Sequence, residues 1–544
     1  MQDNDRTTAR RVWIGIAAAL TLVALLVGVG IAVFRQPATR EASPSPTPVS
    51  PFERPSGGDP ARPAAHLTPA RHWMNDPQRP FLLNGVWHYY YLYNADHPDG
   101  NGTAWYHATS TDLVHWTDEG VAIDKYTNGL GDIWTGTAVV DHENTAGFGR
   151  DAVVAMVTQQ DDGVQRQSLF VSRDGGYRFE PYEGNPVIEN PGVRDFRDPR
   201  LVWDDAHERW IMALAEGSKI GFYTSPNLKD WTYRSGFTTQ GLGVLECPDL
   251  FPMAVDGDPS RVRWVLAAGA NGADEGMTTG TVYWTGDWDG ETFTPDDPGH
   301  QWLDRGADYY AAVTWDDPRQ TEAERLTTRY GIGWLNNWAY AGDVPGEDWS
   351  GGTDSIVRTI RLVERDGRAT LESAPVDALR GLEGRAEKLD ATTLAAGEAV
   401  DLPQPPSDAY RLRLDVAVDS ADAGELRVRI PRGDGAFATV GYDSERRQVF
   451  VARDADAIAD RMPDAYRVVR TAPVDARDGR IRLDVVVDVA SIEVFTGDGA
   501  ALSMVSGSAA GTKGLRVEAS GGAKRLDGAS VAPLRVAPVE RRAD

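Results

Sequence analysis

The 544-residue sequence predicts an all-β protein, namely a five-bladed β-propeller followed by a C-terminal antiparallel β-sandwich, with one N-terminal transmembrane helix. Three observations predict it: a turn motif that recurs about every 60 residues, a later alternation of apolar and polar residues, and an apolar segment near the N-terminus. The predicted parts are a basic cytoplasmic end (1–11), a signal-anchor (12–34), a Pro/Ser-rich linker (35–65), the propeller (66–365), a second linker (366–390) and the sandwich (391–544).

The N-terminal apolar segment covers residues 12–34, with Arg10 and Arg11 before it and Arg35 after it. It is long enough to cross a bilayer core of about 30 Å. It is also longer than the apolar region of a cleavable signal peptide, and no cleavage site with small residues follows it. Because the arginines favour a cytoplasmic N-terminus, we predict a single-pass membrane protein whose remainder is extracellular. A cleaved signal, which would make the protein secreted, is the alternative.

The propeller is predicted from four polar turns, each of which ends in an aromatic residue. They begin at Ser110, Ser172, Ser225 and Thr285, at intervals of 62, 53 and 60 residues. Short segments rich in β-branched and aromatic residues precede them, as strands require. This period suits a four-stranded sheet better than a helical repeat. About 300 residues at this period predict five blades.

The sandwich is predicted from strict alternation in residues 410–418 and 481–488, which is typical of antiparallel strands with one buried face. Before it, residues 374–382 have Pro near the start and Gly near the end, which indicates a short linking helix. We assign a supporting role and no chemistry to the sandwich.

Composition narrows the possible partners. A net charge of −26 disfavours nucleic acid and anionic membrane surfaces, so a neutral polymer or small neutral molecule fits better. The 17 Trp suit both sugar faces and a β-rich core. The single cysteine, Cys247, excludes an intramolecular disulfide, and we interpret it as a buried packing residue rather than a nucleophile.

Three acidic residues stand in short segments next to proline: Asp76 in 73–77, Asp198 in 196–199 and Glu246 in 246–249. One such segment alone indicates only a turn. In a propeller, however, the innermost strands converge on one channel, so distant residues can meet at its mouth. A carboxylate paired with a carboxylic acid is what a glycosidase needs.

The three segments, in this order, resemble those of glycoside hydrolase family 32, the fructan hydrolases and invertases, and the resemblance runs from about His66 to the C-terminus. It implies the same fold, with Asp76 as nucleophile on a fructosyl unit and Glu246 as general acid. It also implies that Asp198 and Arg197 hold fructose hydroxyls and stabilise the oxocarbenium-like transition state. A retaining mechanism requires the two reacting carboxyl groups to lie about 5–5.5 Å apart.

Further positions carry over from the same resemblance as substrate-binding residues. Asn75 neighbours the nucleophile, Trp105 matches a pocket-lining Trp, and Trp134 and Thr135 stand in a Phe-Ser-Gly-Ser-like segment. Asp308 belongs to another family block, as does 334–338. The reaction implies no cofactor, and the sequence offers no His/Cys cluster for a metal.

Two departures from the usual family pattern concern the substrate. Gln78-Arg79-Pro80 replaces the usual Asn-Gly, and Leu92 replaces a usual Gln. Both resemble the levan-active branch of the family. We therefore predict a monomeric levanase that cleaves β-2,6-fructosyl links and releases levanbiose. A levan fructotransferase, an exo-acting β-fructosidase and a non-catalytic fructan-binding protein remain as alternatives.

Overall fold

The computed structural model describes residues 61–536 and the backbone of 540–541, apart from 99–101, 273–274, 278, 347–348, 350–351, 418–422, 434 and 510–512. The predicted segments 1–11 and 12–34, and nearly all of 35–65, therefore lie outside the described residues. No helix in the described part has the length and apolar character needed to cross a bilayer.

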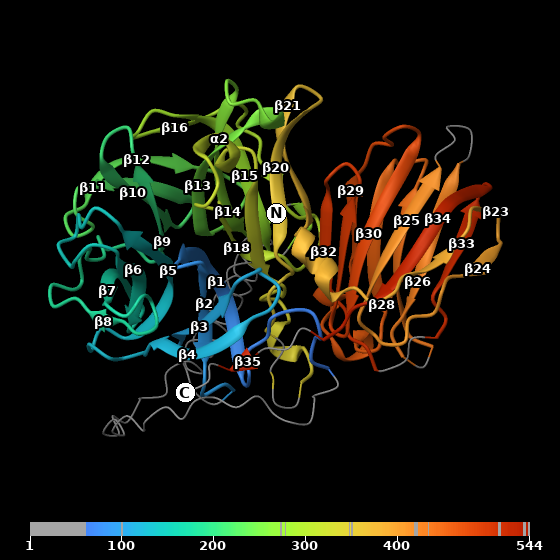
Figure 1. Cartoon of the computed structure of the whole chain (residues 1–544), viewed down its shortest axis with the longest axis horizontal. Helices are drawn as coiled ribbons and strands as arrows, with labels where there is room; N and C mark the ends of the chain where they lie inside the picture. Colours follow the sequence, from blue (N-terminus) through green and yellow to red (C-terminus); the bar gives the residue numbers. More distant parts are fainter. Residues whose placement is uncertain are drawn as a thin grey trace, which may run out of the picture. The chain divides into compact units, whose positions relative to one another are not determined.

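Five antiparallel meanders follow one another along the chain (Figure 1). Blade 1 contains β1 (Trp73–Leu83), β2 (Val86–Asn94), β3 (Ala104–Ser110) and β4 (Thr117–Ile123). Blade 2 contains β5 (Asp132–Asp141), β6 (Ala152–Asp161), β7 (Val164–Ser172) and β8 (Glu180–Pro181). Blade 3 contains β9 (Arg197–Asp204), β10 (Arg209–Glu216), β11 (Lys219–Ser225) and β12 (Thr232–Thr238). Blade 4 contains β13 (Leu245–Ala254), β14 (Val262–Ala270), β15 (Gly280–Trp288) and β16 (Phe293–Pro295), with β17 (Gln301–Trp302) paired to β15.

Blade 5 contains β18 (Tyr310–Trp315), β19 (Arg329–Trp334), β20 (Arg358–Arg365) and β21 (Arg368–Pro375). The first strands of the blades contact one another in the cyclic order β1, β5, β9, β13, β18 and back to β1. The five meanders therefore form a closed propeller, as the sequence predicted. A short strand, β35 (Glu540–Arg541), runs parallel to β4 at the outer edge of blade 1.

The recurring turn connects the third and fourth strands of blades 1 to 4. In the first copy, the Ser110 hydroxyl accepts from the backbone N–H of Leu113 at 2.8 Å, and Asp112 caps the next two N–H groups. In blade 3, the Ser225 hydroxyl accepts from the N–H of Asn227, and Asn227 caps the N–H groups of Lys229 and Asp230. Such side-chain acceptors mimic a backbone turn, which explains why the repeat is visible in the sequence.

The end of the propeller was predicted ten residues too early. β21 pairs with β20 over its whole length, so blade 5 runs to Pro375 rather than to residue 365. The linking helix is a 3₁₀ segment, η4 (Asp377–Leu382), and β22 (Glu387–Leu389) already belongs to the sandwich. The second linker is correspondingly shorter than 366–390. The other helical segments are α2 (Glu322–Arg325), η1 (Val255–Gly257), η3 (Ala341–Asp343), η5 (Ala459–Arg461) and η6 (Asp464–Tyr466).

The sandwich consists of two antiparallel sheets, drawn from yellow-orange to red in Figure 1. One contains β22, β34 (Lys524–Pro533), β25 (Tyr410–Ala417), β30 (Arg480–Asp488), β31 (Ser491–Thr496), β32 (Ala501–Val505) and β23 (Thr392–Leu394). The other contains β24 (Ala399–Asp401), β33 (Arg516–Gly521), β26 (Gly424–Pro431), β27 (Phe437–Asp443), β28 (Gln448–Ala455) and β29 (Val469–Pro473). The predicted alternation holds, because Leu412, Leu414 and Val416 are buried in the core between the sheets.

Buried charges join the sandwich to the propeller. Arg358 of blade 5 donates to Asp304 at 2.7 Å and to Glu493 of β31 at 2.6 Å. The His66 ring lies between Asp488, 2.8 Å from Nδ1, and Glu493, 2.9 Å from Nε2. Since an unpaired buried charge is costly, each member of this cluster depends on the others.

Replacing His66 by Gln is expected to change how stability depends on pH. Burial alone would lower the pKa of His66, but the hydrogen bonds and charges of Asp488 and Glu493 outweigh it and raise the pKa to about 9. The stabilisation by protonated His66 is therefore complete below its ordinary pKa of 6.5 and is lost as pH rises through 9. Urea unfolding between pH 6 and 10 should show the wild type losing about 3 kcal/mol more than His66→Gln over this range. Parallel curves for the two proteins would contradict the expectation.

Candidate active site

All five inner strands carry an irregularity of pairing near their first residues. The register shifts fall between Asn75 and Pro77, Ile133 and Gly136, Arg197 and Arg200, Glu246 and Asp249, and Tyr310 and Val313. Three of these bulges hold a residue other than glycine in the left-handed region: Asp198 (φ 65°), Cys247 (φ 46°) and Ala311 (φ 48°). Bulges re-aim side chains, and such backbone strain clusters at functional sites.

Asp76 of β1, Asp198 of β9 and Glu246 of β13 are brought together there. The Cys247 Sγ lies 3.7 Å from Asp76 Oδ2 and 3.6 Å from Asp198 Oδ2, and the Cys247 backbone N–H donates to Asp198 Oδ2 at 2.9 Å. Burial raises the pKa of the Cys247 thiol well above its ordinary value. The cysteine is thus a buried spacer between two carboxyl groups, in agreement with its interpretation as a packing residue.

Asp76 is held by neighbouring donors. The Thr135 hydroxyl donates to Oδ2 at 2.7 Å, and the Asn75 amide donates to Oδ1 at 3.0 Å. The Trp73 indole fixes Asn75 by donating to its Oδ1 at 2.9 Å. Burial raises the pKa of Asp76 and the charge of Glu246 adds to this, while the bonds from Thr135 and Asn75 act in the opposite direction.

Glu246 is oriented from two sides. Arg197 donates to Oε1 through Nε at 3.0 Å and through Nη2 at 2.9 Å, and the Tyr310 hydroxyl donates to Oε2. Asp195 holds Arg197 in turn, at 2.6 Å from Nη1. Burial raises the pKa of Asp198 to about 7; Arg197 opposes this, and the charges of Glu246 and Asp76 add to it.

Replacing Tyr310 by Phe is expected to lower kcat by about tenfold to a hundredfold with little change in KM, because the carboxyl group of Glu246 loses a donor that fixes its direction. Steady-state kinetics would measure both constants. The matched control is Tyr309→Phe: Tyr309 lies beside Arg358 rather than Glu246 and should retain the wild-type kcat. An unchanged kcat in Tyr310→Phe would exclude this role.

Aromatic side chains lie next to the carboxylates. Trp73 stacks on His97, with ring centroids 4.9 Å apart, and contacts Trp334 and the half-exposed Trp338. Trp134, from the bulge of β5, is partly exposed and donates to Asp132 at 2.7 Å.

Two residues predicted to bind substrate are placed differently. Trp105 is fully buried and donates to the backbone carbonyl of Trp134 at 3.0 Å, so it supports that segment from behind. Asp308 is fully buried at the boundary with the sandwich, where it accepts from Tyr340, Arg453 and the backbone N–H of Val505. The prediction that Asp308 binds substrate is therefore wrong, since its oxygens are committed to joining two domains. Tyr310, two residues further on, reaches the site instead.

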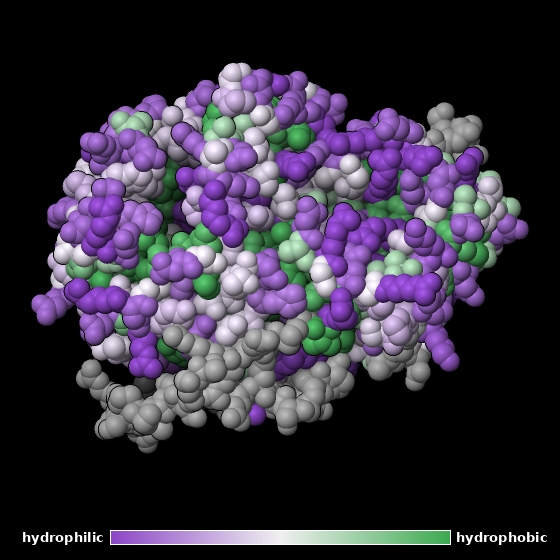
Figure 2. Space-filling view, viewed as in Figure 1, coloured by the Kyte–Doolittle hydropathy of each residue, from purple (hydrophilic) through white to green (hydrophobic). Residues whose placement is uncertain are grey.

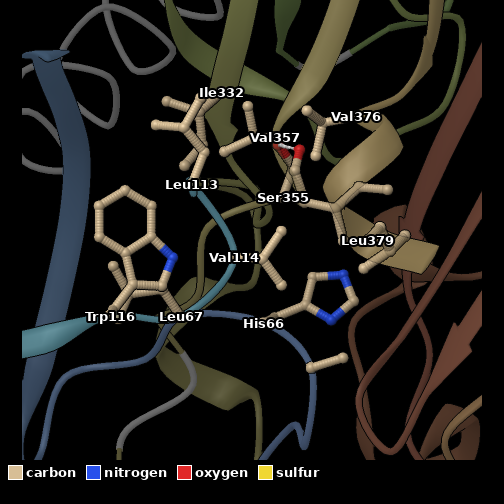
Figure 3. A pocket seen from close by; sticks show the side chains of 12 residues that line it. His66, Leu67, Leu113, Val114, Trp116, Ile332, Ser355, Val357, Val376 and Leu379 are labelled. Carbon is tan, nitrogen blue, oxygen red and sulfur yellow. Dashed lines mark hydrogen bonds between the residues drawn. The ribbon is translucent and has the colours of Figure 1, made fainter. Parts of the chain in front are cut away.

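A cavity elsewhere is not part of this site. Figure 3 shows His66 and Leu67 facing Leu113, Val114 and η4 across it, and none of the three carboxylates lines it. Its lining is mainly aliphatic and offers little to a sugar. On the face drawn in Figure 2, hydrophilic side chains dominate and hydrophobic ones lie mainly in the furrows.

A propeller mouth with a donor-held carboxylate, a second carboxyl group held by arginine and tyrosine, and adjacent aromatic rings defines a glycosidase-type site. Comparison with known proteins agrees. Residues 66–375 match "Glycosyl hydrolases family 32 N-terminal domain" and residues 376–533 match "Glycosyl hydrolases family 32 C terminal". The chain belongs to glycosyl hydrolase family 32 and is a glycoside hydrolase, which confirms the predicted family.

Relatives of known activity are similar over most of their length. The levanbiose-producing levanase of Bacillus subtilis is 46% identical over 80% of this chain and 84% of its own. The levanbiose-producing levanase of Geobacillus stearothermophilus is 47% identical over 70% of this chain and 95% of its own. Among solved structures, exo-inulinase from Aspergillus awamori superimposes with a TM-score of 0.78 at 28% identity, covering 88% of this chain and 99% of that one.

Proposed function

We propose that this protein is a levanase, which hydrolyses β-2,6-fructosyl linkages of levan with retention of configuration and releases levanbiose. The observation that carries the proposal is that two carboxyl groups of one site have different hydrogen-bond partners. Asp76 receives hydrogen bonds from Thr135 and Asn75, and Glu246 is oriented by Arg197 and Tyr310. The two carboxyl groups are thus each held in one orientation by different partners, as the nucleophile and the proton carrier of a retaining glycosidase require.

In the first step, an oxygen of Asp76 attacks the anomeric carbon while Glu246 gives its proton to the departing glycosidic oxygen. The products of this step are an ester of Asp76 with a fructosyl unit that still carries a second fructose, and a shortened chain with a free hydroxyl. In the second step, Glu246 takes a proton from water, the water oxygen attacks the same carbon, and Asp76 leaves. Two inversions give net retention.

Asp198 and Arg197 are proposed to hold the fructosyl unit during both steps. Asp198 is fixed by the N–H of Cys247 and lies beside Asp76, so its carboxyl group can accept from sugar hydroxyls. Positive charge develops on the sugar ring in the transition state, and nearby carboxylates stabilise it. Trp134 and Thr135 are proposed to complete the pocket.

The specificity for levan is supported by two relatives at 46% and 47% identity that are levanbiose-producing levanases. It is also supported by the replaced positions Gln78 and Leu92. Both are buried: Gln78 bridges the backbone of Asp76 and the N–H of Gly136, and Leu92 packs in an apolar cluster with Trp105.

The test is product analysis after separate incubation of the protein with levan, inulin and sucrose. Levanbiose from levan alone is the expected result. Free fructose from all three would replace the proposal by a broad exo-fructosidase, and a product one water lighter than a difructose would indicate a fructotransferase.

We propose further that the enzyme acts outside the cell and that residues 12–34 anchor it, supported by the length of this segment and its flanking arginines. Cell fractionation should find the full chain in the membrane and a chain beginning at residue 61 in the soluble fraction. Recovery from the medium of a protein that has lost its N-terminal segment would indicate a cleaved signal instead.

A further inference from the structure

A second layer of polar side chains lies just beyond the bulges of the inner strands. It comprises one residue from each blade, and we name these five residues the polar ring: Gln78, Thr137, Arg200, Asp249 and Thr314. None is more than 3% exposed. Each stands at, or one residue after, the position where regular pairing resumes. Buried polar side chains need hydrogen-bond partners, and each of these five has a partner on a neighbouring blade.

The first two members connect blades 1, 2 and 3. Gln78 accepts from the backbone N–H of Gly136 in β5 at 2.8 Å and donates to the backbone carbonyl of Asp76 at 2.8 Å. The Thr137 hydroxyl donates to the carbonyl of Pro199 in β9 at 2.8 Å. Each bond ends at an active-site residue or next to one: Gly136 follows Thr135, the carbonyl belongs to Asp76 itself, and Pro199 follows Asp198.

The other three connect blades 3, 4 and 5. Arg200 Nη2 donates to the Thr314 carbonyl at 2.7 Å and lies 2.7 Å from Asp249 Oδ1. Asp249 Oδ2 accepts from the Thr314 N–H at 2.9 Å and from its hydroxyl at 2.6 Å. The circle closes through Asp316 of blade 5, which lies 3.6 Å from the Arg79 guanidinium of blade 1.

We propose that the polar ring is a positioning layer for the reaction: it sets the relative heights of the five inner strands and thereby the separation of Asp76 from Glu246. Hydrophobic packing alone permits neighbouring blades to shift slightly along each other. A hydrogen bond between the inner strands of two blades fixes their relative position. The ring touches no substrate and acts only through the residues above it. This inference rests on the proposed function.

The test uses substitutions that remove one hydroxyl and keep shape and charge. Thr314→Val removes the bond that the hydroxyl donates to Asp249 and the one that it accepts from Arg329 Nε, but keeps the backbone bond to Asp249. Thr137→Val removes the bond to Pro199. Each is expected to lower kcat about tenfold or more while KM for levan changes less than about twofold, since displacement of reacting groups slows the chemical step. Thr314→Ser, which keeps the hydroxyl, should restore kcat.

The matched control is Thr370→Val. Its hydroxyl also joins two blades, donating to Gln301 Oε1 at 3.0 Å, but at the outer strands. We expect a similar loss of thermal stability and a wild-type kcat. Wild-type kcat in folded Thr314→Val and Thr137→Val would overturn the proposal, as would an equal loss in Thr370→Val. Asp76→Asn in the same assay separates the two claims: if it stays active, the proposed function fails; if it is inactive while the ring variants are unaffected, only the positioning layer fails.

Discussion

Replacing Asp76 by Asn is expected to reduce hydrolysis of levan by about 10⁴-fold or more, which corresponds to about 5 kcal/mol of transition-state stabilisation. The amide cannot form the fructosyl ester, so the two-step route is closed. Asn has the shape of Asp and can still contact Thr135 and Asn75, so folding should be preserved. The measurements are kcat/KM on levan and the thermal midpoint.

The matched control for this change is Asp287→Asn, a substitution of an exposed carboxylate on the outer part of blade 4. It should leave both quantities unchanged. Turnover by Asp76→Asn within tenfold of the wild type would refute the nucleophile assignment, and an unfolded Asp76→Asn would require the Ala variant to be compared.

Replacing Glu246 by Gln is expected to cost about 10³-fold on levan, because neither the leaving oxygen nor the attacking water can exchange a proton with an amide. The loss should depend on the leaving group. With β-fructosyl fluoride, whose fluoride departs without protonation, the first step should remain fast and the second should stall. Mass spectrometry of the quenched protein should then find one fructosyl unit on Asp76.

Azide should accelerate turnover of the fluoride by Glu246→Gln, since this anion attacks without help from a base. The product would be β-fructosyl azide. Arg197→Lys is an informative companion, because it keeps the charge beside Glu246 but loses the two-point contact. Equal losses on levan and on the fluoride would assign Glu246 a role other than proton transfer.

The propeller could be predicted because its turn motif has a local cause. Ser110 and Asp112 close their turn through their own neighbours, so the same residue types recur in each blade and the period can be read directly. The end of the propeller could not be read in this way. β21 is a surface strand of mixed character, and its pairing with β20 depends on tertiary context that single-strand patterns do not carry.

The carboxylates were predictable because each stands in a short, recognisable segment. Asp308 and Tyr310 show the limit of that approach. They belong to one block, but the bulge after Tyr310 turns the tyrosine toward Glu246, whereas Asp308 faces the sandwich. A local segment does not reveal on which side of a bulge a side chain falls. The polar ring was hidden for the same reason, since its five members are adjacent only after the strands close.

Glu493 contacts two segments that stand at opposite ends of the propeller sequence. His66 precedes blade 1, Arg358 lies in blade 5, and both meet this one carboxylate of the sandwich. In the described part of the chain, the four main strands of each blade are consecutive, and blades 1 and 5 meet through contacts between β1 and β18 rather than through a shared sheet. The sandwich adds a further connection between the two ends of the propeller, through Glu493. We therefore expect a propeller excised without the sandwich to keep the direct bonds between its first and last blades, such as that of Tyr89 with Asp354, but to be less stable than the whole chain.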